Sequence, residues 1–291
     1  MQLHHVPMRP IVSFVRRHAV LTYFGLVFLL SWGGLLILDP GRFPPSARQF
    51  ANLGPLVYLA IIAGPSVSGI LMIAIADGMP GIRDFLARLR RWRVAPGWYV
   101  LALMPALLIA GATLLLSLIS AELRPAIIAA ENRSAILIGA IGPSLLVGAL
   151  EEIGWTGFAV PHLRARHSIL VTGLVVGVVW GAWHFPLFWE ADSFYATLPL
   201  TILLTRLFAW LPPFRVLLIC IHERTRSLPV VMLMHAAVSF VSIVFAHHGL
   251  SGARLLASPL VSAATMWLLV AGVSIAGRRR SEGHPLEPST V

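Results

Sequence analysis

The amino-acid sequence predicts an all-α fold, a polytopic transmembrane helix bundle of about eight spans. Hydrophobic residues make up 57% of the 291 residues and charged residues only 12%, whereas a soluble domain carries about 25% charged residues. The mean hydropathy is +0.83. Eight apolar segments have lengths near the ~20 residues that a helix needs to cross a bilayer. These features together indicate a multi-span membrane protein.

The eight segments define one transmembrane domain, 19–276, between an N-terminal segment, 1–18, and a C-terminal tail, 277–291. The first segment is too long for a signal-peptide core and no small-residue cleavage site follows it, so we expect a retained helix. The segments are, in order, about 19–38, 54–76, 98–120, 135–160, 168–189, 197–221, 227–247 and 255–276.

Arginine placement orients the bundle. All 22 basic residues are arginine, and the formal net charge is +10. With a cytoplasmic N-terminus, 15 arginines fall in inner segments and five in outer ones, which is the bias of a membrane protein with an even number of spans. We therefore expect a multi-pass protein of the cell membrane with both termini cytoplasmic. Lipid headgroups, not nucleic acid, are the expected partners of the basic charge, above all at the amphipathic segment 83–94. The five outer arginines are Arg42, Arg48, Arg124, Arg133 and Arg254.

Two acidic residues lie where lipid is expected. Glu151 and Glu152 fall inside the fourth span, and a charge at the bilayer centre costs about 3 kcal/mol or more. Such residues usually face a bundle interior or a water-filled cavity and mark a functional site. Two other interpretations stay open: the span could end at residue 150 and leave both glutamates at the interface, or they could form a structural ion pair.

The fifth span adds a histidine on a face of small residues. Glycines recur there every four residues, at Gly173, Gly177 and Gly181, which predicts a face that another helix approaches closely. His184 lies on the same face and should point into the bundle.

The seventh span carries a polar stripe formed by His235, Ser239 and Ser242. Either intramembrane histidine alone could be a hydrogen-bonded packing residue. Two histidines and a glutamate pair, on three spans, instead indicate a site.

These residue types support two kinds of chemistry. A buried glutamate can act as a general base on water where the cavity admits water, and nearby histidines can orient that water or donate to an oxyanion. Glu151, His184 and His235 could equally ligate zinc with water in the fourth position. The single Cys220 excludes an intramolecular disulfide and a Cys-rich metal site. The sequence contains neither H-E-x-x-H nor G-x-S-x-G.

Three short stretches, taken in order, carry a family resemblance. The stretch EEIGWT at 151–156 resembles the motif E-E-x-x-x-R, WGAWH at 180–184 matches an aromatic residue four before a histidine, and HAAVS at 235–239 resembles H-x-x-x-N. This set resembles the CPBP family of CAAX-protease and bacteriocin-processing membrane proteins, which are related to the prenyl-protein endopeptidase. The resemblance covers about 55–245.

The resemblance implies an intramembrane endopeptidase that cuts a peptide or protein substrate near the cytoplasmic side of the membrane, including CAAX-type processing. Glu151 and His184 would activate the water, and His235 and Ser239 would stabilise the oxyanion. Glu152, with Trp180 and Thr156, would support the site. The family implies no obligatory metal, so no cofactor is expected, although the Glu and His side chains leave a divalent metal such as zinc open.

Two positions depart from the family pattern. Thr156 stands in place of the motif arginine and Ser239 in place of the motif asparagine. Without the arginine, the two carboxylates should share a proton. Loss of one oxyanion donor costs about 10²–10³ in rate, so we expect reduced activity. The alternative is a non-catalytic membrane scaffold or a bacteriocin-immunity protein. A proton-relay transporter fits the buried acids but not the order of the motifs.

The sixth span holds Arg206 and Arg215, the two arginines placed inside a span. The stretch LPPFR at 211–215 should break this helix and let Arg215 lie in a water-filled gap near the inner side of the membrane. We predict that Arg215, or else Arg206, supplies from another helix the charge that position 156 lacks. Its guanidinium should then lie within ~4 Å of the Glu152 carboxylate.

Overall fold

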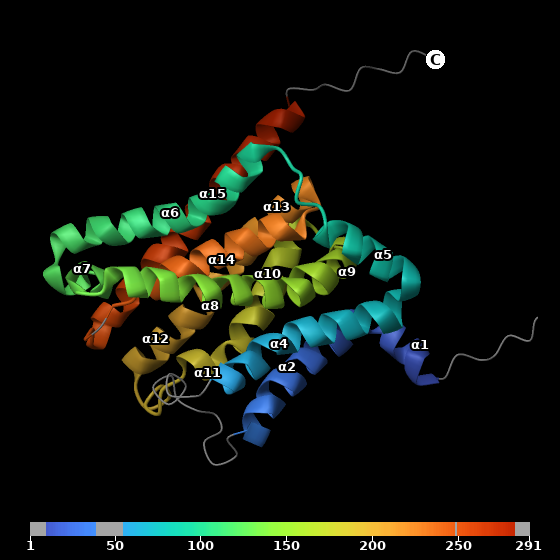
Figure 1. Ribbon diagram of the computed structural model, residues 1–291, viewed down its shortest axis with the longest axis horizontal. Coiled ribbons are helices and arrows are strands. Elements are labelled where there is room, and N and C mark those ends of the chain that lie inside the picture. The colour runs from blue at the N-terminus through green and yellow to red at the C-terminus, as the bar shows by residue number, and fades with distance from the viewer. Residues whose placement is uncertain (1–9, 39–54, 248, 283–291) are drawn as a thin grey trace, which may run out of the picture.

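A computed structural model describes residues 10–38, 55–247 and 249–282, and every regular element in these ranges is helical (Figure 1). The all-α prediction is therefore confirmed. The first half of the chain forms α1 (Pro10–Arg17), α2 (Ala19–Leu38), α4 (Pro55–Met72), the π-helical η2 (Ile73–Asp77), α5 (Gly78–Leu89), α6 (Pro96–Ile119), the 3-10 turn η3 (Ala121–Leu123), α7 (Ala126–Ala129) and α8 (Arg133–Gly154).

The second half continues in the same way. It forms the π-helical η4 (Trp155–Ala159), α9 (Val160–Arg164), α10 (Ile169–Trp183), α11 (Phe185–Phe188), α12 (Thr197–Phe208), α13 (Leu211–Thr225), α14 (Leu228–Val244), the 3-10 turn η5 (Gly252–Leu256) and α15 (Ala257–Glu282).

Each of the eight apolar segments corresponds to a helix. Within the described residues, six stretches are long and apolar enough to cross a membrane by length and composition, and the shorter apolar helices α10 and α14 correspond to the fifth and seventh segments. Side chains on the outside agree with a lipid environment, since Leu118 and Ile119 on α6 are 82% and 81% exposed. The chain is a polytopic helix bundle. The six long stretches are Ala19–Leu38, Val57–Leu89, Pro96–Ile119, Arg133–Arg164, Thr197–Thr225 and Gly252–Ala276.

One element end differs from the prediction. The fifth segment was expected to reach residue 189, but α10 ends at Trp183 and the short α11 follows, with Pro186 in its first turn. The last apolar segment, predicted at about 255–276, agrees with the stretch Gly252–Ala276, and α15 continues beyond this stretch to Glu282.

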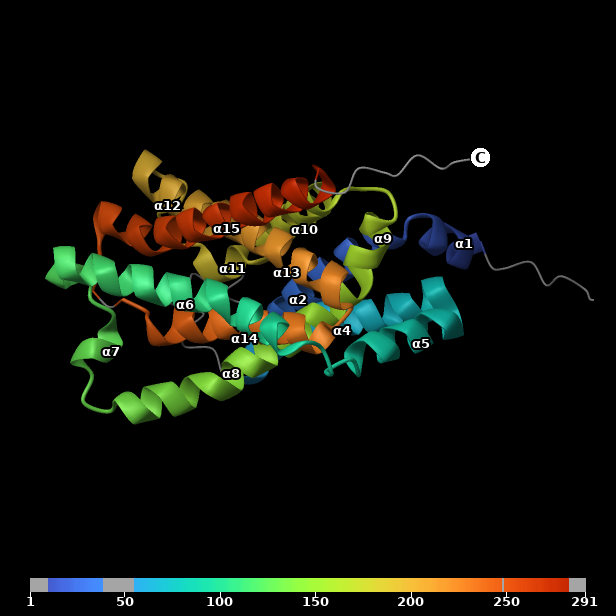
Figure 2. The ribbon, with the colours of Figure 1, turned by 90° about the horizontal axis from the view of Figure 1, so that it is seen from above.

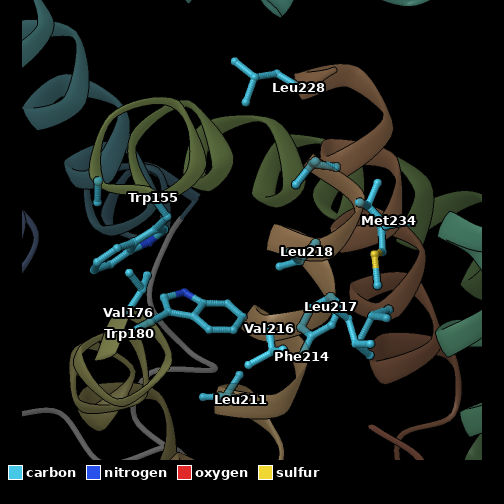
Figure 3. Close-up of a cluster of buried hydrophobic side chains, with 14 of the residues drawn as sticks. Trp155, Val176, Trp180, Leu211, Phe214, Val216, Leu217, Leu218, Leu228 and Met234 are labelled. Carbon is cyan, nitrogen blue, oxygen red and sulfur yellow. The ribbon is translucent and has the colours of Figure 1, made fainter. Parts of the chain in front are cut away.

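The glutamate-bearing helix α8 packs against α4 and α14, and α10 packs against α13. In Figure 3, aromatic side chains from three elements converge between these helices, namely Trp155 of η4, Trp180 of α10 and Phe214 of α13. All three are at most 1% exposed. The core therefore lies where the predicted site residues meet.

The predicted glycine face of α10 is confirmed as a close helix contact. A Cβ atom on Gly173 would lie 2.4 Å from Val216 Cγ2, and one on Gly177 would lie 2.4 Å from Pro212 Cα. A Cβ atom on Gly181 would lie 2.3 Å from the carbonyl oxygen of Leu207. The glycines thus let α13 and the end of α12 approach α10 backbone to backbone.

Candidate functional site

The two glutamates lie inside the protein near the end of α8. Glu151 is 2% exposed and Glu152 is 0% exposed, and α8 continues past both residues to Gly154. The helix therefore continues through both glutamates, and both are buried in the bundle. Where the membrane surface crosses this helix stays a prediction. The π-helical η4 follows at once, and such insertions are frequent at functional sites because they re-aim the following side chains.

Glu152 is the centre of a buried charged cluster. Nη1 of Arg215 on α13 donates to both Glu152 oxygens at 2.8 Å. Nδ1 of His235 on α14 lies 2.7 Å from Oε1, and the Thr156 hydroxyl donates to Oε2. The side chains of Arg215 and Glu152 are both 0% exposed. One carboxylate therefore binds α8, α13 and α14 together.

The predicted pairing of Arg215 with Glu152 is confirmed, since 2.8 Å is well within the expected 4 Å. The predicted helix break is also present, because α12 ends at Phe208 and α13 begins at Leu211. Arg206, the other candidate, lines a cavity with Trp210 and Ser242 instead. The expectation that the two carboxylates share a proton rested on the missing motif arginine, and Arg215 supplies that charge to Glu152 from another helix.

Glu151 has a different environment from its neighbour. Nε1 of Trp180 on α10 donates to Glu151 Oε2 at 2.6 Å. Within the described ranges no arginine or histidine forms an ion pair with Glu151. The two adjacent carboxylates are thus chemically distinct: Glu152 is neutralised and fully occupied, whereas Glu151 accepts a single neutral donor.

Trp180 connects the members of the site. Its indole nitrogen binds Glu151, and its carbonyl oxygen accepts from His184 Nδ1 at 2.8 Å. Its ring lies edge-on to His235 with centroids 5.3 Å apart, and the Arg215 guanidinium carbon lies 4.2 Å from its ring centroid. The cation–π contact gives Arg215 a second favourable neighbour in a desolvated position. Trp180 therefore positions both histidines and both charged groups.

Hydrogen bonds fix which ring nitrogen of each histidine remains available. A carbonyl oxygen only accepts, so His184 carries a proton on Nδ1, and the Glu152 carboxylate likewise accepts from Nδ1 of His235. Nε2 is then the nitrogen of each ring left for another partner. His184 is 9% exposed and points into the bundle as predicted, and His235 is 3% exposed.

Ser239 and Ser242 are the other two residues of the polar stripe in the seventh span. Ser239 lies on α14 one turn beyond His235 and is half-buried. Ser242 donates to the carbonyl oxygen of Val238 at 2.9 Å, within its own helix. The expected stripe is present along α14, but His235 is the member of it that contacts the glutamate cluster.

Glu151, His184 and His235 are the three side chains that could ligate zinc. In the parts of the chain that the structure describes, no three His, Cys, Asp or Glu side chains are grouped as ligands. The zinc ligand set and the expected independence from cofactors both stay predictions.

Three aromatic residues beside the site, Tyr23, Trp155 and Trp183, were not predicted from the sequence. Tyr23 on α2 packs edge-on against Trp155 at 5.6 Å between centroids, and Trp155 lies 6.2 Å from Trp183. The Tyr23 hydroxyl and both indole N–H groups are buried without a hydrogen-bond partner among the described residues. In the sequence they look like ordinary apolar-span aromatics. The adjacency of Trp183 to His184 was the one available signal.

The fold and site together define a class: a polytopic helical membrane protein with a buried Glu–His–Arg cluster shared by α8, α10, α13 and α14. Residues 133–241 match the family model described as type II CAAX prenyl endopeptidase, Rce1-like. That range contains all three motifs and Arg215. The resemblance to this protease family is therefore confirmed.

A curated relative supports the same family. A segment of 44 residues is 39% identical to the CAAX prenyl protease 2 of Methanococcus maripaludis. The aligned segment covers 15% of this chain and 16% of that relative.

Proposed function

We propose that this protein is an intramembrane endopeptidase in which Glu151 activates the hydrolytic water near the cytoplasmic side of the membrane. The difference between the two adjacent carboxylates carries the proposal. Glu152 is held by Arg215, His235 and Thr156 and has no oxygen free to accept a proton. Glu151 receives only the Trp180 N–H among the described residues. The family match to protease sequences supports the reaction type.

The proposed reaction uses the chain's own groups. A water molecule between Glu151 and Nε2 of His184 gives a proton to the Glu151 carboxylate while its oxygen attacks the scissile carbonyl carbon. His235, in its protonated form, donates from Nε2 to the oxyanion. The C–N bond then breaks, and the amine leaves with the proton held by Glu151. Water is added across one peptide bond, and the glutamate returns to its starting state.

Glu152 and Arg215 act as positioning residues in this scheme. The Glu152 carboxylate accepts from Nδ1 of His235 and so fixes the orientation of the ring. Arg215 balances the carboxylate from α13, so the site keeps the charge that the family motif places at position 156. Thr156 by itself is therefore not expected to reduce the activity. Ser239 is still a shorter hydrogen-bond donor than the asparagine of the family motif.

In the test, the purified full-length protein and its Glu151→Gln variant are each incubated with a library of prenylated and unprenylated peptides, and their rates of cleavage are compared. The substitution keeps shape and removes the base, so cleavage should fall by about 10²–10⁴-fold while the yield of folded protein stays unchanged. Glu122→Gln is the matched control, because Glu122 is 55% exposed in an ion pair with Arg254 far from the site. Full cleavage by Glu151→Gln would overturn the assignment. A wild-type protein that binds library peptides and cuts none would favour the scaffold alternative.

The same assay addresses metal. We expect cleavage to survive exhaustive dialysis against a chelator, because the family resemblance implies no obligatory metal and Arg215 already neutralises Glu152. Stoichiometric zinc that copurifies and restores activity to a chelated, inactive sample would contradict this and would assign Glu151, His184 and His235 as ligands.

A further inference from the structure

The helices α1, α5 and α9 lie toward one end of the bundle (Figures 1 and 2). Residues of these helices line a polar cavity. Its volume is about 630 Å³. The wall is formed by the end of α1, the start of α2, the face of α5 and the loop after α9. None of the glutamate, histidine or arginine side chains of the site described above lines it. The cavity is therefore a separate feature of the fold.

The cavity wall is basic. It carries Arg16, Arg17, Arg88 and Arg166 against two aspartates, Asp77 and Asp84. Both aspartates already have partners within the wall. Asp77 Oδ1 lies 3.1 Å from Nε2 of His162, and Asp84 Oδ2 accepts from Nε of Arg88 at 2.8 Å. The arginine excess therefore favours an anion in the cavity.

Arg88 gives the cavity a fixed donor. This arginine is only 6% exposed. Its Nε donates to Asp84, and its Nη2 donates to the carbonyl oxygen of Gly157 at 3.0 Å. Its Nη1 is buried without a hydrogen-bond partner among the described residues. A guanidinium anchored through Nε and Nη2, with its Nη1 amino group left over, is arranged to bind an oxyanion.

The wall also has an apolar side. Ala19, Val20 and Leu21 at the start of α2 line the cavity, and Leu21 is 69% exposed. These residues begin a helix that is long and apolar enough to cross a membrane. A ligand that places its charged group beside the arginines would therefore have an apolar surface next to it along α2.

We propose that this cavity binds the phosphate headgroup of an anionic phospholipid, with the acyl chains lying along α2. The basic wall and the unpartnered Arg88 Nη1 fit the phosphate, and the exposed apolar start of α2 fits the chains. Arg17 and Arg166, both exposed at the rim, add long-range attraction. The carbonyl of Gly157, which Arg88 binds, lies one residue after Thr156, so an occupied cavity would brace the helix that carries the glutamate pair.

Native mass spectrometry of the full-length protein in detergent tests this site. Phosphatidylglycerol is titrated against phosphatidylcholine with the same acyl chains, with inorganic phosphate and an acidic peptide as competitors. We expect preferential binding of phosphatidylglycerol, weakened roughly fivefold by Arg17→Gln and again by Arg166→Gln, since each basic residue near the headgroup contributes a similar share. Arg83→Gln is the matched control, because Arg83 is an exposed arginine of α5 that does not line the cavity.

The outcomes separate the possibilities. Equal binding of the two lipids, or equal loss in Arg83→Gln, would overturn the proposal. Displacement by inorganic phosphate at the lipid's own concentration would make this a free-phosphate site, and displacement by the acidic peptide would make it a peptide site. Thermal midpoints of the rim variants control for misfolding. Glu151→Gln should bind the lipid like the wild type, so the result is independent of proteolysis.

Discussion

The candidate site depends on the balance of charge around Glu152. A single buried carboxylate is opposed by Arg215 from α13 and His235 from α14. Burying a pair of charges brings a desolvation cost, but removing one partner leaves the other uncompensated, which costs about 3–5 kcal/mol. The family motif would place the arginine one helical turn from the glutamate on the same helix. This chain places it on a different helix, so the ion pair also joins elements.

Moving the arginine from position 215 to position 156 tests whether Arg215 takes the place of the motif arginine. We expect Arg215→Gln to destabilise the protein by about 3–5 kcal/mol, because Glu152 loses its cation. Thr156→Arg combined with Arg215→Gln should recover a large part of that loss, since residue 156 lies one turn from Glu152 and its hydroxyl already touches the carboxylate. Denaturation midpoints in detergent provide the measurement.

Thr156→Val is the control for this exchange. It removes only the hydroxyl hydrogen bond and should cost much less than loss of the cation, about 1–3 kcal/mol. A double variant no more stable than Arg215→Gln alone would show that the ion pair works only from α13.

Close contacts between helices bring the motif residues together. The three glycines of α10 sit against α13 and the end of α12, at distances that leave no room for a Cβ atom. Gly148 does the same for α8 and α14, since its Cβ would lie 2.6 Å from the Met232 carbonyl oxygen. These contacts place Glu152, Trp180, Arg215 and His235 within hydrogen-bond or ring-contact distance.

A substitution on the α10 face tests the packing. We expect Gly177→Ala to lower stability by about 1–3 kcal/mol, because the added methyl would meet backbone of Pro212 and force the helices apart. Gly139→Ala is the matched control on α8, since nothing lies within 4 Å of its Cβ position. That change should stabilise the helix by about 0.5–1 kcal/mol. Equal thermal midpoints for the two variants would contradict the close contact.

The sequence predicts these elements better than it predicts their contacts. Apolar length identified the helices, and the Pro-Pro pair located the break between α12 and α13. The cost of an unpaired buried charge pointed to Arg215, because that argument needs no coordinates. Contacts such as His235 with Glu152, 83 residues apart, could not be located. The π-helical η4 was missed because backbone hydrogen-bond register leaves no pattern in hydropathy.

The basic cavity and the Arg254–Glu122 ion pair lie at opposite ends of the bundle. Figure 2 shows α1, α5 and α9 toward one end of the long axis and α7 toward the other. The first group carries the basic cavity, and the opposite end carries the ion pair of Arg254 with Glu122. The predicted outer residues Arg42 and Arg48 and the predicted inner residue Arg9 lie outside the described ranges.

This arrangement leads to a prediction about topology. Eight spans place the chain ends on one side, and the arginine bias of 15 to five assigns that side to the cytoplasm. A reporter that is active only in the cytoplasm should therefore be active when fused after residue 281, at the end of α15. It should be inactive when inserted at residue 131, in the exposed connection between α7 and α8. A reporter active only outside the cytoplasm should give the reverse pattern. Activity of the outside reporter at both positions would mean an even number of spans between them, and one of the shorter helices, α10 or α14, would then not cross the membrane.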